Sequence, residues 1–274
     1  MRAIVLAAGR GSRLRPFTAD RPKCLVEIGG RTLLARQVDA LRAAGARRVG
    51  VVAGWHAEAF ASTGLPVFLN PDWERTTMAA SLAAAESWLA QEPTLVSYGD
   101  IVYGPHTARA LAASDAELAI SYDPHWHALW SRRFADPLDD AETFVRDDAG
   151  RLLDIGGRAG RVEEIQGQYM GLLRMTPTAW AAIERARSAD PAVAALDMTG
   201  LLRHVVRARL LEVATVPAVG PWCEFDHPSD IDVGLDVLRA LDAETAEASE
   251  TARGAGPTAG EPDQENGCVR TTGT

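Results

Sequence analysis

Residues 3–14 read Ala3-Ile4-Val5-Leu6-Ala7-Ala8-Gly9-Arg10-Gly11-Ser12-Arg13-Leu14, and Pro22-Lys23 follows a few residues later. The apolar residues predict a short buried strand, and the small and basic residues after it predict a loop. Glycine and alanine in such a loop allow backbone N–H groups to approach phosphate oxygens closely. We therefore expect a phosphate-binding site here, with Arg10, Arg13 and Lys23 as its cations.

The loop differs from two familiar phosphate-binding loops. It matches neither GxGxxG, which binds the pyrophosphate of dinucleotides, nor GxxxxGK[ST], which cradles nucleoside triphosphates in P-loop enzymes. The sequence therefore argues against both of these chemistries.

Composition limits the class of protein. The chain has 274 residues, 47% of them hydrophobic and 24% charged, which is enough for one large domain with a sizeable core. A net charge of −9 argues against a nucleic-acid partner. No apolar stretch approaches the roughly 20 residues of a membrane span, and the first apolar segment is too short for a secretory signal. We expect no membrane partner.

Three cysteines, Cys24, Cys223 and Cys268, form no CxxC pair. This argues against a zinc site and a disulfide framework, and it fits the reducing cytoplasm.

The first half of the chain alternates between strand-like and helix-like segments. Such alternation predicts an α/β fold with a doubly wound, mostly parallel sheet of the Rossmann-like type, whose ligands bind at the carboxyl ends of its strands. The expected strands are 3–6, 49–53, 66–69, 94–97 and 117–121, and the expected helices are 33–44, 77–89 and 107–113.

The second half is less regular, and residues 123–140 show no clean periodicity. Short strands are expected around a hairpin turn at Asp147-Asp148-Ala149-Gly150, followed by helices at 177–186 and 198–207. We divide the chain into a nucleotide-binding half (1–121), an irregular α+β acceptor-binding half (122–242) and a disordered tail (243–274). The tail is rich in Ala, Glu, Thr, Gly and Pro and has no aromatic residue.

Two acidic segments are candidates for metal binding. Asp100 follows Gly99 at the end of an apolar strand, so its carboxylate can reach into the crevice, although an Asp in this position is also a common turn former. Glu224 and Asp226 alternate along an extended segment and therefore point to one side. Asp226 has a second interpretation as the cap of the helix after Pro228.

These patterns resemble the nucleotidyltransferases that activate sugar 1-phosphates or phosphocholine. The spacing L-A-A-G-x-G-x-R-L…P-K carries the likeness, which extends over nearly all of residues 1–240. Within that superfamily the chain looks most like the phosphocholine and phosphonate cytidylyltransferases. The residues that carry this are Asn70-Pro71, 139–143, 164–171, Asp197-Met198-Thr199, Trp222, Glu224 and Asp226.

The resemblance implies a reaction. The enzyme would transfer a cytidylyl group from CTP to a small phospho-alcohol or phosphonate, release pyrophosphate and use Mg²⁺ held by Asp100 and Asp226. Arg13 would hold the β- and γ-phosphates, and Lys23 would lie between the acceptor and the α-phosphate. By the same analogy, the residues in contact with the nucleotide would be Leu6, Ala7, Ala8, Gly9 and Gly11, with Ser81 near the base.

The acceptor pocket is expected in the irregular half, where aromatic and acidic residues interleave. Aromatic faces and carboxylates together bind an ammonium head group, such as that of phosphocholine or 2-aminoethylphosphonate. Trp126 and Trp130 are four residues apart, which is also the spacing of two core residues on a helix. The expected pocket residues are Trp126, Trp130, Asp140, Glu164, Tyr169, Trp222 and Glu224.

Two other functions stay open. Sugar-activating members usually carry Glu-Lys-Pro after the central hairpin, where this chain reads Ile155-Gly156-Gly157-Arg158. This disfavours a sugar or cyclitol 1-phosphate acceptor with UTP, dTTP or GTP without excluding it. A non-catalytic nucleotide-binding regulatory protein is the other alternative, and the sequence does not decide between a monomer and a homodimer.

Overall fold

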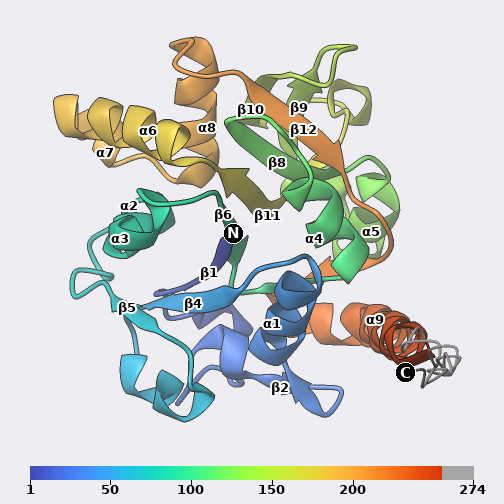
Figure 1. Ribbon diagram of the computed structural model, residues 1–274. Helices are drawn as coiled ribbons and strands as arrows, with labels where there is room; N and C mark the ends of the chain where they lie inside the picture. Colours follow the sequence, from blue (N-terminus) through green and yellow to red (C-terminus); the bar gives the residue numbers. More distant parts are fainter. Residues whose placement is uncertain (255–274) are drawn as a thin grey trace, which may run out of the picture.

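A seven-stranded sheet forms the centre of the computed structural model, which describes residues 1–254 and the side chains of residues 1–243. Its strand order is β12-β8-β11-β6-β1-β4-β5 (Figure 1). Every neighbouring pair is parallel except the two pairs made by β11, which runs antiparallel to both β6 and β8. The expected doubly wound, mostly parallel sheet is confirmed.

The first half of the chain forms one side of this sheet. β1 (Arg2–Ala7) lies between β4 (Arg48–Ala53) and β6 (Thr94–Tyr98), and β5 (Val67–Leu69) is the edge strand. Residues 3–6 are buried without alternation because helices cover both faces of the sheet, as in parallel sheets generally. The carboxyl ends of β1 and β6 therefore open side by side.

Helices cover both faces. α1 (Leu33–Ala43) and α4 (Pro105–Ala112) lie on one side of the sheet, and α2 (Met78–Ser81), α3 (Glu86–Leu89) and α6 (Pro177–Ala189) lie on the other (Figure 1). The helix expected at 77–89 is interrupted by a 3₁₀ segment, Leu82–Ala85, between α2 and α3.

The second half contributes the remaining strands of the sheet and two small additions. β11 (Gln168–Met175) and β12 (Val213–Pro217) complete the sheet together with β8 (Leu118–Asp123), which spans the boundary between the two halves. β9 (Glu142–Arg146) pairs with β10 (Leu152–Arg158) in the expected hairpin. α7 (Pro191–Ala194) and α8 (Met198–Arg207) follow α6, and α8 packs on β10. The helix expected at 198–207 is confirmed.

One expectation was wrong in this half. The segment 123–140 is not irregular throughout, because Trp126–Arg133 forms the helix α5. Trp126 and Trp130 are both buried on it and their ring centroids are 6.1 Å apart. Their four-residue spacing thus reflects the packing of one helix face.

The C-terminal helix and two short two-stranded ladders form a second, smaller core. α9 (Ser229–Gly254) packs beside β13 (Trp222–Glu224), which pairs with β7 (Ile101–Tyr103), and β2 (Glu27–Ile28) pairs with β3 (Arg31–Thr32) nearby. The buried residues of this core come from distant segments of the chain: Leu14, Val26, Ile28, Leu33, Val102, Cys223, Phe225, Leu238 and Leu241. It therefore holds the basic loop against the late acidic segment.

α9 runs past residue 243, the expected start of the disordered tail, to Gly254. That part of the expected tail is helical instead, and the remainder, residues 255–274, lies outside the described residues. No helix within the described part of the chain is long and apolar enough to cross a membrane.

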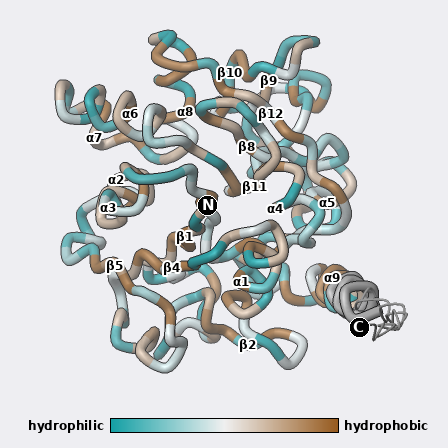
Figure 2. The backbone as a smooth tube through the Cα atoms, in the orientation of Figure 1, coloured by the Kyte–Doolittle hydropathy of each residue, from teal (hydrophilic) through white to brown (hydrophobic). Residues whose placement is uncertain are grey.

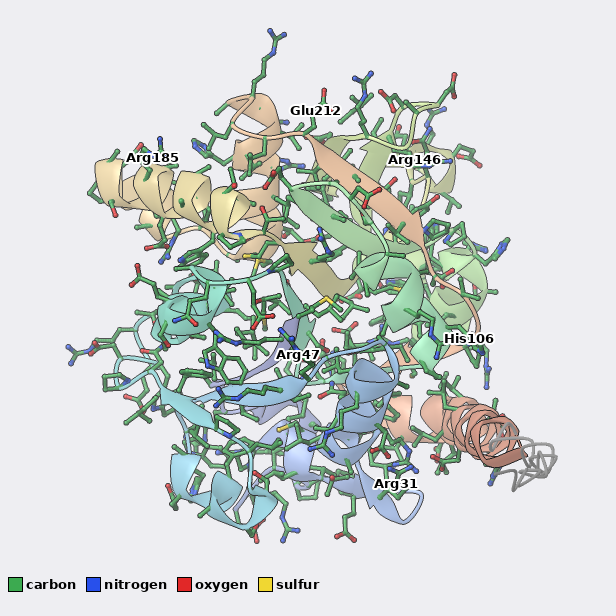
Figure 3. All side chains as sticks on the ribbon, in the orientation of Figure 1. Arg31, Arg47, His106, Arg146, Arg185 and Glu212 are labelled. Atoms are coloured by element: carbon green, nitrogen blue, oxygen red, sulfur yellow. The ribbon has the colours of Figure 1, made fainter. Side chains whose placement is uncertain are left out.

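Apolar stretches follow the strands, whereas hydrophilic ones gather at the turns around the outside (Figure 2). Charged side chains such as Arg146, Arg185 and Glu212 point outward at the periphery (Figure 3). Charged groups inside the protein are therefore exceptions that need partners.

Candidate active site

The glycine-rich loop after β1 shapes a cavity of about 230 Å³, here called the loop cavity. Gly11 adopts φ +62°, and a Cβ there would lie 3.0 Å from Lys23 Cβ, so the loop packs directly on the lysine. Gly99 plays a similar part, since a Cβ would lie 2.7 Å from the carbonyl oxygen of Leu6. The cavity is lined by Leu6, Ala7, Gly9, Gly11, Ser12, Arg13, Lys23, Cys24, Met78, Gly99 and Asp100.

Four of the five residues expected to contact the nucleotide line this cavity. The exception is Ala8, which is buried and whose carbonyl accepts a hydrogen bond from the backbone N–H of Trp55 at 3.0 Å. Ser81 also lies outside the cavity. Its hydroxyl is buried, accepts a hydrogen bond from Asn70 Nδ2 at 2.9 Å and donates one to the Thr77 carbonyl at 3.1 Å. Both bonds of the hydroxyl are therefore made within the protein, at and near the start of α2.

Lys23 joins the two predicted metal carboxylates. Its Nζ lies 2.8 Å from Asp100 Oδ2 and 2.5 Å from Asp226 Oδ1. Arg13 Nη2 lies 2.7 Å from the other oxygen of Asp226. Residues 13, 23, 100 and 226 come from four segments, so the structure brings together all the catalytic and metal residues expected from the sequence.

The pairing of β13 with β7 explains how Asp226 reaches Asp100. Glu224 lies opposite Ile101 in this ladder, and Phe225 N–H donates to the Asp100 carbonyl at 2.9 Å. This register places the late acidic segment directly beside the end of β6.

Burial and charge set the protonation of this group. Burial alone would lower the pKa of Lys23, but Asp100 and Asp226 outweigh it and raise the pKa above its ordinary value, so Lys23 stays protonated. Burial acts to raise the pKa of Asp226, yet the charge of Lys23 outweighs it and holds that pKa below its ordinary value. At neutral pH the pair is therefore ionised.

Glu224 is a third carboxylate beside these two. Asp100, Glu224 and Asp226 each offer an oxygen within 4.8 Å of the others. Burial raises the pKa of Glu224 well above its ordinary value, and the charges of Asp226 and Asp100 add to this effect. Three acidic oxygens in one place repel one another, so the cluster favours a cation.

A second cavity of about 420 Å³, here called the acidic cavity, adjoins the loop cavity, and Arg13 and Met78 line both. Its walls come from both halves of the chain. Its lining residues are Arg13, Met78, Tyr98, Trp130, Asp140, Glu142, Gln168, Tyr169, Asp197, Met198, Thr199, Glu224 and Asp226.

Four of the seven expected acceptor residues line the acidic cavity, namely Trp130, Asp140, Tyr169 and Glu224. Trp126 and Trp222 are buried instead in the core, where their indole N–H groups donate to the Ile165 carbonyl and to Asp123 Oδ2. Glu164 does not line this cavity either. It ends an exposed 3₁₀ turn, where it accepts from Gly160 N–H at 3.0 Å and pairs with Arg161 at 3.1 Å.

Seven residues that line this cavity were not expected as site residues, among them Glu142, Asp197 and Thr199, which the sequence motifs contained. Glu142 begins β9, Asp197 caps α8 through a 2.8 Å bond from Gly200 N–H, and Thr199 lies in the first turn of that helix. Burial raises the pKa of Glu142 above its ordinary value, and the charge of Asp197 adds to it. Composition also distinguishes Lys23, which is the sole lysine among the 28 lysine and arginine residues of the sequence.

Comparison with known proteins identifies the family. The family described as "MobA-like NTP transferase domain" matches residues 3–160. A CTP:phosphoglutamine cytidylyltransferase of Campylobacter jejuni is 31% identical over 86% of this chain and 100% of its own length. A 2-aminoethylphosphonate cytidylyltransferase of Lancefieldella rimae is 28% identical over 56% of this chain and 60% of its own.

A solved structure agrees on the fold. The CTP:phosphocholine cytidylyltransferase of Streptococcus pneumoniae superposes with a TM-score of 0.67 over 86% of this chain and 98% of its own, at 20% identity. The sheet, the glycine-rich loop and these matches lead to one conclusion: the chain belongs to the nucleotidyltransferases that have a MobA-like NTP transferase domain.

Proposed function

We propose that the protein is a Mg²⁺-dependent cytidylyltransferase that uses CTP and a small phosphorylated or phosphonate acceptor with a cationic head group. The observation that carries this is the position of Lys23, Asp100 and Asp226 between two adjoining cavities. The loop cavity suits a nucleotide phosphate chain, and the acidic cavity suits the acceptor. The names of the relatives support the choice of CTP.

The chemistry needs cations more than it needs an activated nucleophile. The acceptor's phosphate or phosphonate oxygen is already anionic near neutral pH. It forms a bond to the α-phosphorus of the nucleotide as the bond from that phosphorus to the pyrophosphate oxygen breaks. Lys23 and Arg13 are placed to bind the oxygens of both substrates, reduce their repulsion and stabilise the charge on the departing pyrophosphate.

The residues present fit a divalent metal ion. Asp100 Oδ1 is buried and has no hydrogen-bond partner in the described part of the chain, which leaves an oxygen free to coordinate. Asp100 and Asp226 would hold Mg²⁺, with Glu224 beside them, since Mg²⁺ prefers carboxylate and phosphate oxygens. When bound, Mg²⁺ supplies positive charge to the phosphate oxygens.

The acidic cavity supports a cationic acceptor. Asp140, Glu142 and Asp197 line it in addition to Glu224 and Asp226, and Trp130 and Tyr169 are aromatic residues of its lining. Carboxylates and an aromatic face attract an ammonium group by Coulomb and cation–π interactions. Two acceptors named for relatives, 2-aminoethylphosphonate and phosphocholine, carry a cationic nitrogen.

Pyrophosphate release tests the reaction directly. CTP, UTP, dTTP and GTP are each combined with phosphocholine, 2-aminoethylphosphonate, 2-hydroxyethylphosphonate and glucose 1-phosphate in the presence of Mg²⁺. We expect release with CTP and an amino-headed acceptor. Release with glucose 1-phosphate and another nucleotide would overturn the proposal in favour of sugar activation.

Neutralising either metal carboxylate should stop turnover without unfolding the protein. Asp100→Asn and Asp226→Asn are each expected to lower kcat by about 10²-fold or more, because an electrostatic contact to the reacting phosphates is lost. Asp148→Asn, in the exposed hairpin turn, is the matched control. Wild-type rates and Mg²⁺ dependence in the two site variants would contradict the metal assignment.

The single lysine makes Lys23 directly observable. Lysine labelled with ¹⁵N at Nζ gives one ammonium signal from this chain, and we expect it to shift when CTP and Mg²⁺ are added, because Nζ exchanges carboxylate partners for phosphate oxygens. Lys23→Ala should lower kcat by about 10²-fold. An unmoved signal at saturating CTP, or unchanged turnover, would remove Lys23 from the reaction.

Glu142 provides a test of the head-group site. Glu142→Gln keeps the shape of the side chain and removes its charge, so the KM for the amino-headed acceptor 2-aminoethylphosphonate should rise roughly 10-fold. The KM for CTP should not change. The acceptor 2-hydroxyethylphosphonate lacks the cation, so its KM should stay the same or fall. An equal rise for both acceptors would contradict a charge contact.

A further inference from the structure

Arg133 is a buried charge to which the proposed reaction assigns no role. It is the last residue of α5, and its side chain is 0% exposed. A buried guanidinium is strongly destabilising unless carboxylates and hydrogen bonds compensate its charge. The contacts that compensate the charge of Arg133 therefore indicate its role.

Its guanidinium bonds to two carboxyl groups on the late acidic segment. Nε and Nη2 donate to the two oxygens of Asp230 at 3.0 and 3.3 Å, and Nη1 donates to Glu224 Oε2 at 3.0 Å. The bond to Glu224 fixes one of the three clustered carboxyl groups. A bidentate arginine contact also fixes orientation, which a lysine ammonium does not.

Asp230, which binds Arg133, also accepts a hydrogen bond from the backbone of Asp226. Its Oδ2 accepts hydrogen bonds from the backbone N–H groups of Asp226 and His227, both at 2.8 Å. These bonds satisfy two backbone donors just before the start of α9. Asp230 therefore fixes the backbone at Asp226, whose carboxylate contacts Lys23 and Arg13.

The other side of Arg133 faces the acceptor region. Its guanidinium carbon lies 5.1 Å from the ring centroid of Trp130 and 5.0 Å from that of Phe134. Trp130 lines the acidic cavity and donates its indole N–H to Asp140 Oδ2 at 3.1 Å. One buried cation thus contacts the carboxylate cluster and the acceptor wall.

We propose that Arg133 is a positioning residue that aligns the metal-binding carboxylates with the acceptor cavity. It orients Glu224 directly, Asp226 through Asp230, and Trp130 through its ring face. This inference rests on the proposed function. A purely structural role predicts a different result, namely a loss of stability alone.

Metal binding without the acceptor separates the two roles. The affinity for Mn²⁺ is measured by electron paramagnetic resonance with CTP present, alongside the melting temperature of each variant. Arg133→Lys keeps the charge but lacks the planar fork that makes the bidentate contact to Asp230 together with the bond to Glu224. We expect it to bind Mn²⁺ roughly 10–100-fold more weakly. Its acceptor KM, measured by pyrophosphate release, should rise as well.

The neighbouring arginine is a matched control. Arg132 is half exposed and makes only long contacts, to the Val233 carbonyl at 3.5 Å and to Asp236 at 3.4 Å. Arg132→Met should leave Mn²⁺ affinity and acceptor KM unchanged. Asp230→Asn keeps the shape of the side chain but removes its charge, so it should reproduce the Mn²⁺ loss. This variant tests the inference if Arg133→Lys does not fold.

The outcomes separate this inference from the proposed function. Folded Arg133→Lys and Asp230→Asn with wild-type Mn²⁺ affinity, or with a lowered melting temperature only, would overturn the role of Arg133. Absence of Mn²⁺ binding to the wild-type protein with CTP would instead overturn the proposed function.

Discussion

Mutual repulsion among three clustered carboxyl groups is the constraint on which this structure depends. One carboxyl oxygen from each of Asp100, Glu224 and Asp226 lies within 4.8 Å of the other two. Because these groups are largely buried, the folded state needs cations around them. Lys23, Arg13 and Arg133 supply these cations from three segments of the chain. The fold therefore holds the acidic cluster and its cations together as one unit.

The second core explains how residues so far apart in the chain hold this geometry. Leu14 and Val26 lie on either side of Lys23 in the sequence, Cys223 and Phe225 interleave with Glu224 and Asp226, and all four apolar residues are buried together. Each of these charged residues therefore stands near an apolar neighbour that is fixed in place. The packing of these apolar neighbours therefore contributes to where the charged residues meet.

The sequence predicted the parts of the site that depend on local pattern. The strand and glycine-rich loop at residues 3–14 and Asp100 at the end of β6 follow from apolar runs and small residues. Glu164 lies outside the cavity because its charge is satisfied locally by Arg161 and Gly160, which no pattern of residue types indicates. The helix α5 was expected only as an alternative explanation of the Trp126–Trp130 spacing, because Pro124 and Pro137 interrupt the pattern on either side. The β13–β7 pairing joins residues 101–103 to residues 222–224, and local sequence does not indicate that they pair.

The place of β11 in the sheet has a consequence for the chain as a whole. β11 lies between β6 and β8 and pairs with both, although it follows them by many residues in the sequence. A polypeptide that ended near residue 121 would expose two facing strand edges with nothing to join them. A cut there does not divide this chain into two pieces that each close their own sheet. The two parts of the chain on either side of residue 121 therefore share one sheet, and each depends on the other to complete it.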